Sequence, residues 1–396
     1  MKCTVDRKSL KTALATAKHC LPLKPLSDHE ANPVLHLVPG KLTVVATDMS
    51  QVCSVTVEAE TEESFSMSLD LKKLEKIISK TDNGNITIEY GMGGRARVSQ
   101  TGSDGFVEIP SLPVTKVPVF DRSSPGEVAS ASGPLDTVVL AEGLDFAGAF
   151  MPDVVERNPK YDFVLIKDGL VYGANGVNRR GYFVSPALRF PGELKFLKKF
   201  VPVAVKLLKS LAVPQVTVKN LDRVLTLETP DGLFSYACLK ARTDAPDIPM
   251  AYLKSSGPYT EIDLAKALKA MERITIPEYQ SAGASVGVAL VLPPADADGN
   301  AELSLKLVAA GKLSGKEKIP CKRVGENEEG GLEVDKVVDF KLFKELAGAM
   351  PSKCDLKFYA NDPEARYFKM QSKHVVGSAN CVSVAVGSYA RINRVS

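Results

Sequence analysis

The residue types that most often do chemistry are spread along this sequence without a catalytic or metal-binding spacing. The cysteines never form a C-x-x-C pair, and the four histidines are scattered, which argues against a structural zinc site and a disulfide framework. A G-x-S-x-G elbow, an H-E-x-x-H helix and a Cys/His pair are all missing from the sequence. Carboxylates are plentiful, so an acid–base pair assembled by folding stays open. We expect reduced, mostly buried thiols at Cys3, Cys20, Cys53, Cys238, Cys321, Cys354 and Cys381.

Two glycine-rich segments have a composition that could hold a phosphate. GMGGR at Gly91 joins two predicted strands and has no helix start behind it, which is typical of a hairpin turn. GANGVNRRG at Gly173 brings Arg179 and Arg180 beside a glycine turn, but strands flank it and the Walker signature is missing. We therefore predict no nucleotide site and no cofactor.

Basic residues gather on the predicted helices, opposite the apolar stripes. A helix expected over residues 7–20 places Leu10 and Leu14 on one side, and a helix over residues 70–80 repeats lysines at every fourth position. A single lysine stripe is usually a solvated face, but five helices share this bias in a chain whose net charge is only +3. Lysine is a point charge without the fork that arginine uses to read guanine, so the pattern predicts sequence-independent attraction to phosphates.

The candidate phosphate contacts come from all three thirds of the chain. One helix is expected to extend from Lys195 to Lys209, while the helix near Leu144 is acidic and would offer contacts only at its end. The candidates are Arg7, Lys8, Lys11, Lys18, Lys72, Lys76, Lys80, Arg157, Lys160, Tyr161, Lys198, Lys206, Lys209, Lys266, Lys269, Arg273, Lys341 and Lys344.

The elements that position these residues recur at a long period. A helix over residues 70–80 precedes strands at Ile86, Arg95 and Phe106, and similar series start at Val203 and Asp339. Corresponding strands lie about 130 to 140 residues apart, which is a domain length. Fainter copies of the first helix occur near Leu144 and over residues 262–273, and segments 121–134 and 246–258 read as links. The sequence therefore predicts an α+β fold with antiparallel strands, repeated in domains 1–124, 125–252 and 253–396.

Length and composition agree with that division. A chain of 396 residues with 44% hydrophobic and 24% charged residues is typical of a globular protein of two or three domains. The most apolar stretch, at 286–293, is shorter than a membrane span, and MKCTVDRKSL lacks the apolar core of a secretory signal. We expect a cytoplasmic protein with no membrane partner.

Several segments resemble one known family. MK-x-TVDR at the start, LTVVATDM at Leu42, SMSLDLKKLEKIISKTDNGNITIEY at Ser66 and FVEIPSLP at Phe106 resemble the first domain of the bacterial-type sliding clamp, the β subunit of DNA polymerase III. LKARTDAPDIP at Leu239 is similar too, and the third domain is weakly collinear. The resemblance implies a non-enzymatic DNA clamp. It would be a head-to-tail homodimer of six domains, with helices lining the hole around duplex DNA and antiparallel sheets outside.

The resemblance also implies partners and their sites. Besides itself and double-stranded DNA, the clamp would hold DNA polymerase, clamp loader and repair proteins through short peptides in an apolar pocket. The pocket would use Phe163, Ala174, Asn175, Gly176, Pro246, Asp247, Met250, Val384 and Val386. The dimer interface would use Phe106, Ile274 and Ile276, for which ordinary core packing is the alternative. Bacterial clamps commonly end in Met-Pro-Met-Arg, whereas this chain continues VAVGSYARINRVS, which leaves its peptide preference open.

Three other readings compete with the clamp. A non-topological DNA-binding protein would also explain the lysines, because lysines can bind DNA phosphates without the protein encircling the duplex. A structural ring component, such as a viral one, would form large assemblies. A small-molecule enzyme would need a concave site with convergent titratable groups.

Overall fold

A computed structural model describes most of the chain, and its described residues form two compact units. It describes residues 1–22, 24–25, 31–82, 84–91, 93–112, 114, 131–151, 161–176, 178–253, 259–279, 286–291, 296–309, 312–324, 333–351, 356–359 and 367–389. The first unit combines Met1–Ala141 with Phe190–Arg242, and the second combines Glu142–Arg189 with Thr243–Ser396.

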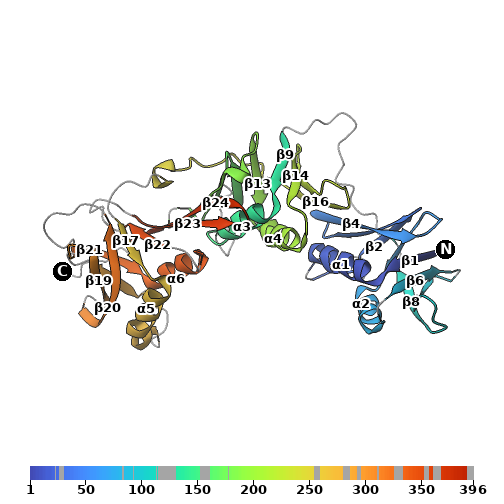
Figure 1. Ribbon diagram of the computed structural model, residues 1–396, viewed down its shortest axis with the longest axis horizontal. Coiled ribbons are helices and arrows are strands. Elements are labelled where there is room, and N and C mark those ends of the chain that lie inside the picture. Colours follow the sequence, from blue (N-terminus) through green and yellow to red (C-terminus); the bar gives the residue numbers. More distant parts are fainter. Residues whose placement is uncertain are drawn as a thin grey trace. The chain divides into compact units, whose positions relative to one another are not determined.

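The first unit is built on one antiparallel sheet (Figure 1). Its strands are β1 (Lys2–Asp6), β2 (Val34–Val38), β3 (Lys41–Thr47), β4 (Gln51–Glu60), β5 (Phe65–Leu69), β6 (Asn85–Tyr90), β7 (Arg95–Gln100), β8 (Phe106–Leu112), β9 (Ala131–Asp136), β14 (Gln215–Asn220), β15 (Val224–Glu228) and β16 (Phe234–Leu239). A further strand of this unit, β13 (Glu193–Leu197), is not part of this sheet. The sheet order is β1-β6-β7-β8-β5-β2-β3-β4-β16-β15-β14-β9. The pairing of β4 with β16 joins two of the repeated copies in one sheet.

Helices cover one side of this sheet. They are α1 (Arg7–Ala17), α2 (Leu71–Lys80) and α4 (Val201–Ser210), with the short 3-10 helices η1 (Lys18–Cys20) and η4 (Lys198–Phe200). α1 packs on β3 and β4 and touches α2, while α4 touches η1. Helix α3 (Thr137–Gly148) follows β9 directly.

The second unit repeats the same architecture. Its strands are β10 (Phe163–Lys167), β11 (Leu170–Ala174), β12 (Arg179–Val184), β17 (Tyr259–Ile262), β18 (Gly287–Val291), β19 (Asn300–Ala309), β20 (Lys312–Val324), β21 (Glu333–Asp339), β22 (Leu356–Tyr359), β23 (Tyr367–Val376) and β24 (Ala379–Ser388). They are ordered β10-β11-β12-β24-β23-β22-β17-β20-β19-β18-β21. The helices are α5 (Leu264–Tyr279) and α6 (Phe340–Ala349), with η3 (Pro186–Leu188) and η5 (Met250–Leu253). α5 packs on β19 and β20, and α6 packs on β21 and β24.

A strand, an aspartate and a helix follow one another at five places in the chain. The aspartate carboxylate accepts the backbone N–H of the residue three positions later, at 2.8 to 3.0 Å, which satisfies one of the free donors at a helix start. These aspartates are Asp6, Asp70, Asp136, Asp263 and Asp339, before α1, α2, α3, α5 and α6. The repeat found in the sequence therefore has a common local junction.

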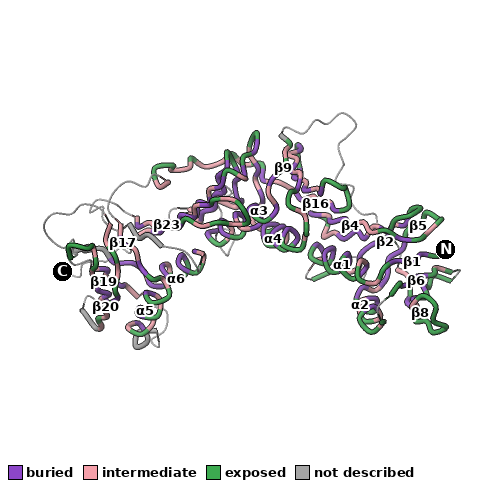
Figure 2. The backbone as a smooth tube through the Cα atoms, viewed as in Figure 1, coloured by how far each residue is buried: buried purple, intermediate pink, exposed green. Residues whose placement is uncertain are grey.

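Buried residues lie between sheets and helices, where Figure 2 shows them as purple runs. In the second unit, glycines let helices approach the strands closely. A Cβ added at Gly173 would meet the carbonyl oxygen of Ala147 in α3, and one at Gly387 would lie 2.5 Å from Leu346 Cδ1 in α6. These contacts identify the helix-covered face of β11 and β24.

The structure confirms the α+β prediction and corrects two element boundaries. The helix expected from Lys195 to Lys209 is strand β13, then η4, then α4 from Val201 only. The expected link at 121–134 overlaps β9, whose Pro134 pairs with Thr217 at the edge of the sheet. Proline is tolerated there because an edge strand leaves one side of its backbone unpaired. The division into three domains stays a prediction.

Candidate functional site

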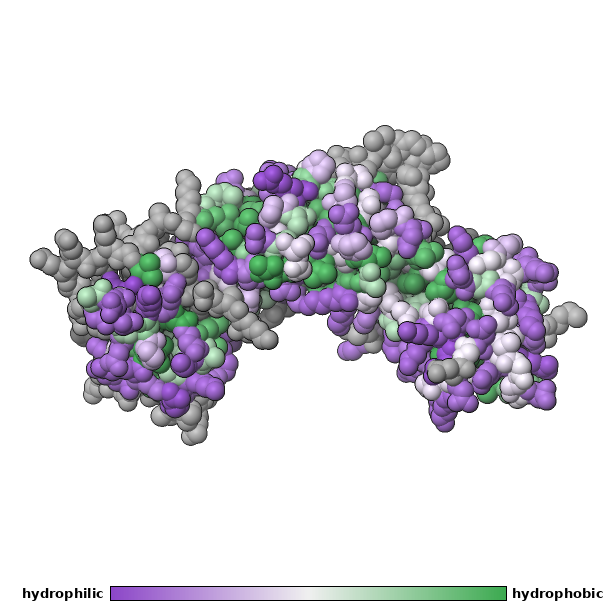
Figure 3. Space-filling model, in the orientation of Figure 1, coloured by the Kyte–Doolittle hydropathy of each residue, from purple (hydrophilic) through white to green (hydrophobic). Residues whose placement is uncertain are grey.

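The lysines of α1 and α2 lie on solvent-facing sides of the helices. Lys8, Lys11 and Lys18 are exposed, as are Lys72, Lys76 and Lys80, whereas Leu10, Leu14, Leu74 and Ile78 are at most 1% exposed. In Figure 3 the surface over α1 and α2 is largely hydrophilic. The separation of apolar and basic faces that the spacing predicts is therefore present.

Two of the candidate cations in this unit have partners that the sequence did not reveal. Arg7 Nε donates to the carbonyl oxygen of Ile78 at 2.8 Å and fastens the start of α1 to α2. Lys18 Nζ lies 2.9 Å from a carboxylate oxygen of Glu75 on α2. The charges of Lys72, Lys76 and Lys80 have no ion-pair partner among the described residues.

The middle of the chain contributes fewer exposed cations than expected. Lys206 and Lys209 are exposed on α4. Lys198 lies in η4, and its ammonium nitrogen is buried without a hydrogen-bond partner among the described residues, so it differs from the other candidates. His19 of η1 has a lowered pKa because burial, Lys206 and Lys18 all disfavour its charged form.

The second unit has a basic helix face as well, partly neutralised. Lys266, Lys269, Arg273, Lys341 and Lys344 are all exposed. Ion pairs join Arg273 to Glu317, Lys344 to Glu272 and Lys266 to Asp263. Lys269 and Lys341 have no ion-pair partner among the described residues. Arg157 and Lys160 lie outside the described residues, and Tyr161 is half-buried.

The candidate interface residues lie in unlike environments. Phe106 is 53% exposed at the start of β8, and the Arg97 guanidinium carbon lies 4.6 Å from its ring centroid. Residues 106–110 of β8 pair with β7, and β5 pairs only with residues 111 and 112, so one edge is open among the described strands. Ile274 belongs to α5, 3.4 Å from where Gly315 would place a Cβ. The side chain of Ile276 lies outside the described residues.

Four candidate pocket residues share one face of the second sheet, opposite the helix-covered face. Ala174 pairs with Arg180, and Arg180 pairs with Val386. Tyr182 pairs with Val384. Directly opposed residues in an antiparallel sheet point to the same side. Leu165 pairs with Tyr172 and therefore lies on this face. Phe163 is two residues before Leu165 on β10, so its side chain lies on the same face. Phe163, Ala174, Val384 and Val386 are at most 4% exposed, so they form a buried floor.

The remaining candidates border this floor. Asn175 Oδ1 accepts the backbone N–H of Arg179 at 3.0 Å, and Gly176 has the positive φ of 86° that the turn requires. Met250 is 51% exposed in η5, Pro246 is half-buried and Asp247 is exposed. Tyr182 Oη donates to the carbonyl oxygen of Pro249 at 3.4 Å, which links the segment carrying these residues to the sheet.

An arginine–tyrosine cluster above this floor was not predicted. The Arg180 guanidinium carbon lies 5.6 Å from the ring centroid of Tyr252 and 5.0 Å from that of Tyr367. The Tyr172 and Tyr182 centroids are 5.1 Å apart. The sequence places Arg180 in an anion-like loop, but Tyr252 and Tyr367 come from distant segments and give no local signal. The site is therefore more polar than the apolar pocket that the resemblance implies.

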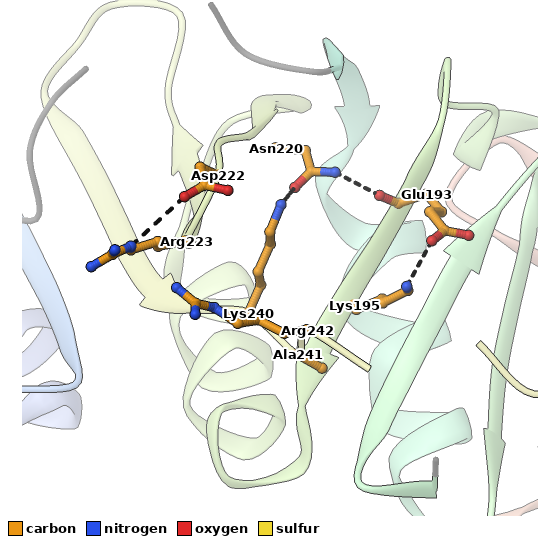
Figure 4. A pocket seen from close by; sticks show the side chains of 8 residues that line it. All are labelled: Glu193, Lys195, Asn220, Asp222, Arg223, Lys240, Ala241 and Arg242. Carbon is orange, nitrogen blue, oxygen red and sulfur yellow. Dashed lines mark hydrogen bonds and ion pairs between the residues drawn. The ribbon is translucent and has the colours of Figure 1, made fainter. Parts of the chain in front are cut away.

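Two polar cavities lie elsewhere, both in the first unit. One, of about 440 Å³, is lined by residues of β13, β14 and the end of β16 (Figure 4). There Lys240 donates to Asn220 and Leu221, Lys195 pairs with Glu193, and Arg223 pairs with Asp222. The second, of about 580 Å³, contains a ladder in which Glu108 accepts from Arg95 and Arg97. Since these groups satisfy one another, neither cavity points to a ligand.

Other chemistry has little support among the described residues. No group of three or more His, Cys, Asp or Glu side chains there could hold a metal ion. The six described cysteines are free, and all but Cys321 are buried, so the expected burial holds for five of them; Cys354 lies outside the described residues. None of the described helices has the length and apolarity needed to cross a membrane.

Comparisons with known proteins agree with the geometry. Residues 1–121 match the family model of the DNA polymerase III beta subunit, N-terminal domain, and a search of curated proteins finds no match. Among solved structures, the DNA polymerase sliding clamp from Caulobacter crescentus superimposes with a TM-score of 0.73 at 16% identity, over 99% of this chain and 100% of that one.

Two more relatives show the same likeness. The DNA polymerase III subunit beta from Pseudomonas aeruginosa gives a TM-score of 0.73 at 16% identity, with 99% and 100% covered. The DNA polymerase III beta subunit from Thermotoga maritima gives 0.72 at 14%, with 99% of each chain covered. The chain therefore has the fold of the bacterial sliding clamps along nearly its entire length, and its first 121 residues match the family model of the DNA polymerase III beta subunit, N-terminal domain.

Proposed function

We propose that this chain is a sliding DNA clamp, a non-enzymatic processivity factor that encircles duplex DNA and tethers a replicative polymerase. The observation that carries the proposal is the exposed basic face shared by helices of both units. Those lysines point away from the sheets, and their point charges attract phosphates without reading sequence.

In this proposal, two chains close head to tail into a ring. The open edge of β8 is one contact surface, because an unpaired strand edge carries free backbone donors and acceptors. The half-exposed Phe106 and its neighbour Val107, 50% exposed, supply apolar area there. Ile274, half-buried on α5 beside Gly315 of β20, is the candidate contact of the other chain's surface.

Polymerase, clamp loader and repair proteins would bind as short peptides beside η5. The buried floor of Val384 and Val386 gives the site rigidity, while the exposed Met250 and the half-buried Tyr252 form its accessible rim.

DNA topology provides the test. The protein, loaded by its cognate loader on nicked circular DNA and washed at high salt, should stay bound and should be lost after the circle is linearised. An ordinary DNA-binding protein would be lost from both forms, because salt weakens phosphate contacts regardless of topology. Retention that ignores linearisation, or a monomer mass under loading conditions, would reject the clamp. Large assemblies would favour a structural ring component, and turnover of a small molecule without DNA would favour an enzyme.

A further inference from the structure

Arg180 occupies the centre of the proposed peptide site, held between aromatic rings. Its guanidinium carbon faces Tyr252 and Tyr367 at 5.6 and 5.0 Å from their centroids, and these two rings meet edge to face at 5.8 Å. Cation–π contacts hold a guanidinium in place without neutralising its charge. The group is therefore positioned but still charged.

No carboxylate in the described part of the chain balances this charge. Among the described residues, Arg180 forms no ion pair. Two lysines of β23 lie on the same face: Lys369, which pairs with Val386, and Lys373. On this face no position is Asp or Glu in β10, β11, β12, β23 or β24. Burial raises the pKa of Tyr172 to about 12 and also raises that of Tyr252, so these phenols stay neutral near neutral pH and supply no negative charge.

One donor of Arg180 is left unused. Its Nη1 is buried and has no hydrogen-bond partner among the described residues. A buried donor without an acceptor is costly, and arginine favours planar, two-point pairing with carboxylates. Tyr252 faces the guanidinium from η5, a short turn with no buried residue, so displacing its ring would disturb no buried residue of that turn.

We propose that Arg180 is a specificity-determining residue that receives a carboxylate of the partner peptide, so that this clamp prefers acidic peptides. The inference rests on the proposed function, because it assigns a ligand chemistry to the same peptide site. The peptide places apolar side chains near Met250 and its carboxylate against Arg180. The carboxylate belongs to an aspartate or glutamate side chain or to the peptide's C-terminus.

Defined peptide pools test this with the full-length protein. Immobilised protein is incubated with pentapeptide pools fixed as Asp or as Asn at the centre and randomised elsewhere, each made as C-terminal amide and as free acid, and retained peptide is quantified by mass spectrometry. We expect retention to be about tenfold higher for the Asp pool than for the Asn pool, or for the free acid than for the amide. A tenfold difference corresponds to the free energy of one charge-assisted hydrogen-bonded pair. Asp over Asn identifies a side-chain carboxylate, and free acid over amide identifies the C-terminus.

Variants assign the effect to Arg180. Arg180→Leu should abolish the preference, and Arg180→Lys should keep part of it, because a point charge remains without the planar fork. Arg223→Leu is the matched control, since this arginine side chain is 75% exposed outside the site, and it should leave the preference unchanged. Thermal unfolding of each variant checks the fold, and Arg180→Lys carries the test if Arg180→Leu fails to fold.

Equal retention of all pools, or a preference that survives in Arg180→Leu, overturns the inference. Those results leave the proposed function standing if the protein is still retained on nicked circular DNA and lost on linearisation. Loss of topological retention together with a carboxylate preference would reject the clamp and keep the acidic-peptide site.

Discussion

Lys18 Nζ donates to both carboxylate oxygens of Glu75, at 3.0 and 2.9 Å, and so joins the end of α1 to α2. The second unit has a matching link between its two helices, from Lys344 of α6 to Glu272 of α5 at 2.6 Å. In both helix pairs, one lysine on the candidate DNA-contact face is held by an acid of the neighbouring helix. Such a lysine is less available to phosphates than an unpaired one.

Glu75→Gln should therefore strengthen DNA binding. Removing the acid frees Lys18, so the slope of log K against log salt for duplex DNA should steepen by up to about 0.9. Stability should change by less than about 1 kcal/mol, because this pair is partly exposed and screened by solvent. Titrations with a labelled duplex at several salt concentrations measure the slope, and Glu62→Gln serves as a control on an exposed acid outside the helices. An unchanged slope would mean that Lys18 does not face DNA.

Lys72, Lys76 and Lys80 on α2 should be needed for DNA binding but not for folding. Replacing all three by glutamate should weaken duplex binding and lower retention on circular DNA, whereas the unfolding midpoint should move little because the three side chains are exposed. Lys41→Glu, at an exposed position beside the β2–β3 turn, is the control. Wild-type DNA retention in the triple variant would place α2 away from DNA.

Helix faces and the succession of strands along the chain could be predicted from the sequence because they depend on local spacing. The apolar stripes of α1 and α2, the hairpin at Gly91 and the strands around Gly173 follow from periodicity and turn residues within a few positions. β9 was mistaken for a link because Pro134 marks both links and edge strands. The run of lysines from 195 to 209 resembled one helix, although Pro202 starts α4 at its N-terminus.

The candidate site was harder to predict because its contacts join distant residues. Nothing near Lys18 in the sequence indicates that Glu75 will pair with it, and nothing near Arg180 indicates Tyr252 or Tyr367. The family resemblance predicted which positions form the buried floor. It did not predict the polar side chains beside the floor that distinguish this chain. The exposed or buried state of Lys198 likewise depends on packing around η4.

Gly173 and Gly348 should respond to alanine with opposite signs. A Cβ at Gly173 would collide with the backbone carbonyl of Ala147, whereas Gly348 on α6 has no atom within 4 Å of that position. Gly173→Ala should lower stability by about 1 to 3 kcal/mol through overpacking. Gly348→Ala should raise it by up to about 1 kcal/mol through helix propensity. Urea unfolding of both variants measures the difference, and a Gly173→Ala variant no less stable than the parent would contradict the close approach of α3 to β11.

His374 should make the protein less stable in mild acid. Burial lowers the pKa of its imidazole against an opposing effect of Glu142, and its ring lies 6.0 Å from that of Phe183. Because the folded pKa lies below the unfolded value of about 6.5, the unfolded state binds the proton first as pH falls. The stability that the neutral ring contributes is therefore lost as the pH falls below about 6.5, and this loss levels off below the pKa of the folded state.

His374→Phe should reduce this acid sensitivity while keeping an aromatic ring against Phe183. Urea midpoints at about pH 8 and about pH 5.5 should differ less in the variant than in the unmodified protein. His19 and His36 also have lowered pKa values, chiefly through burial, so some pH dependence should persist. Parallel pH profiles for variant and parent would show that His374 does not titrate differently on folding.

Tyr236 should hold together the seam at which β4 meets β16. Its hydroxyl donates to Gln51 Oε1 at 2.8 Å, and the two residues are 1% and 4% exposed. Tyr236→Phe leaves the Gln51 oxygen buried without that donor, so the free energy of unfolding should fall by about 1 to 3 kcal/mol. Tyr90→Phe removes a hydroxyl at a half-buried site away from the seam and should change stability by no more than about 0.5 kcal/mol. If the two variants unfold at the same urea concentration, the Tyr236 hydroxyl contributes nothing to joining the first two repeats, and the backbone pairing of β4 with β16 and apolar packing must hold that seam.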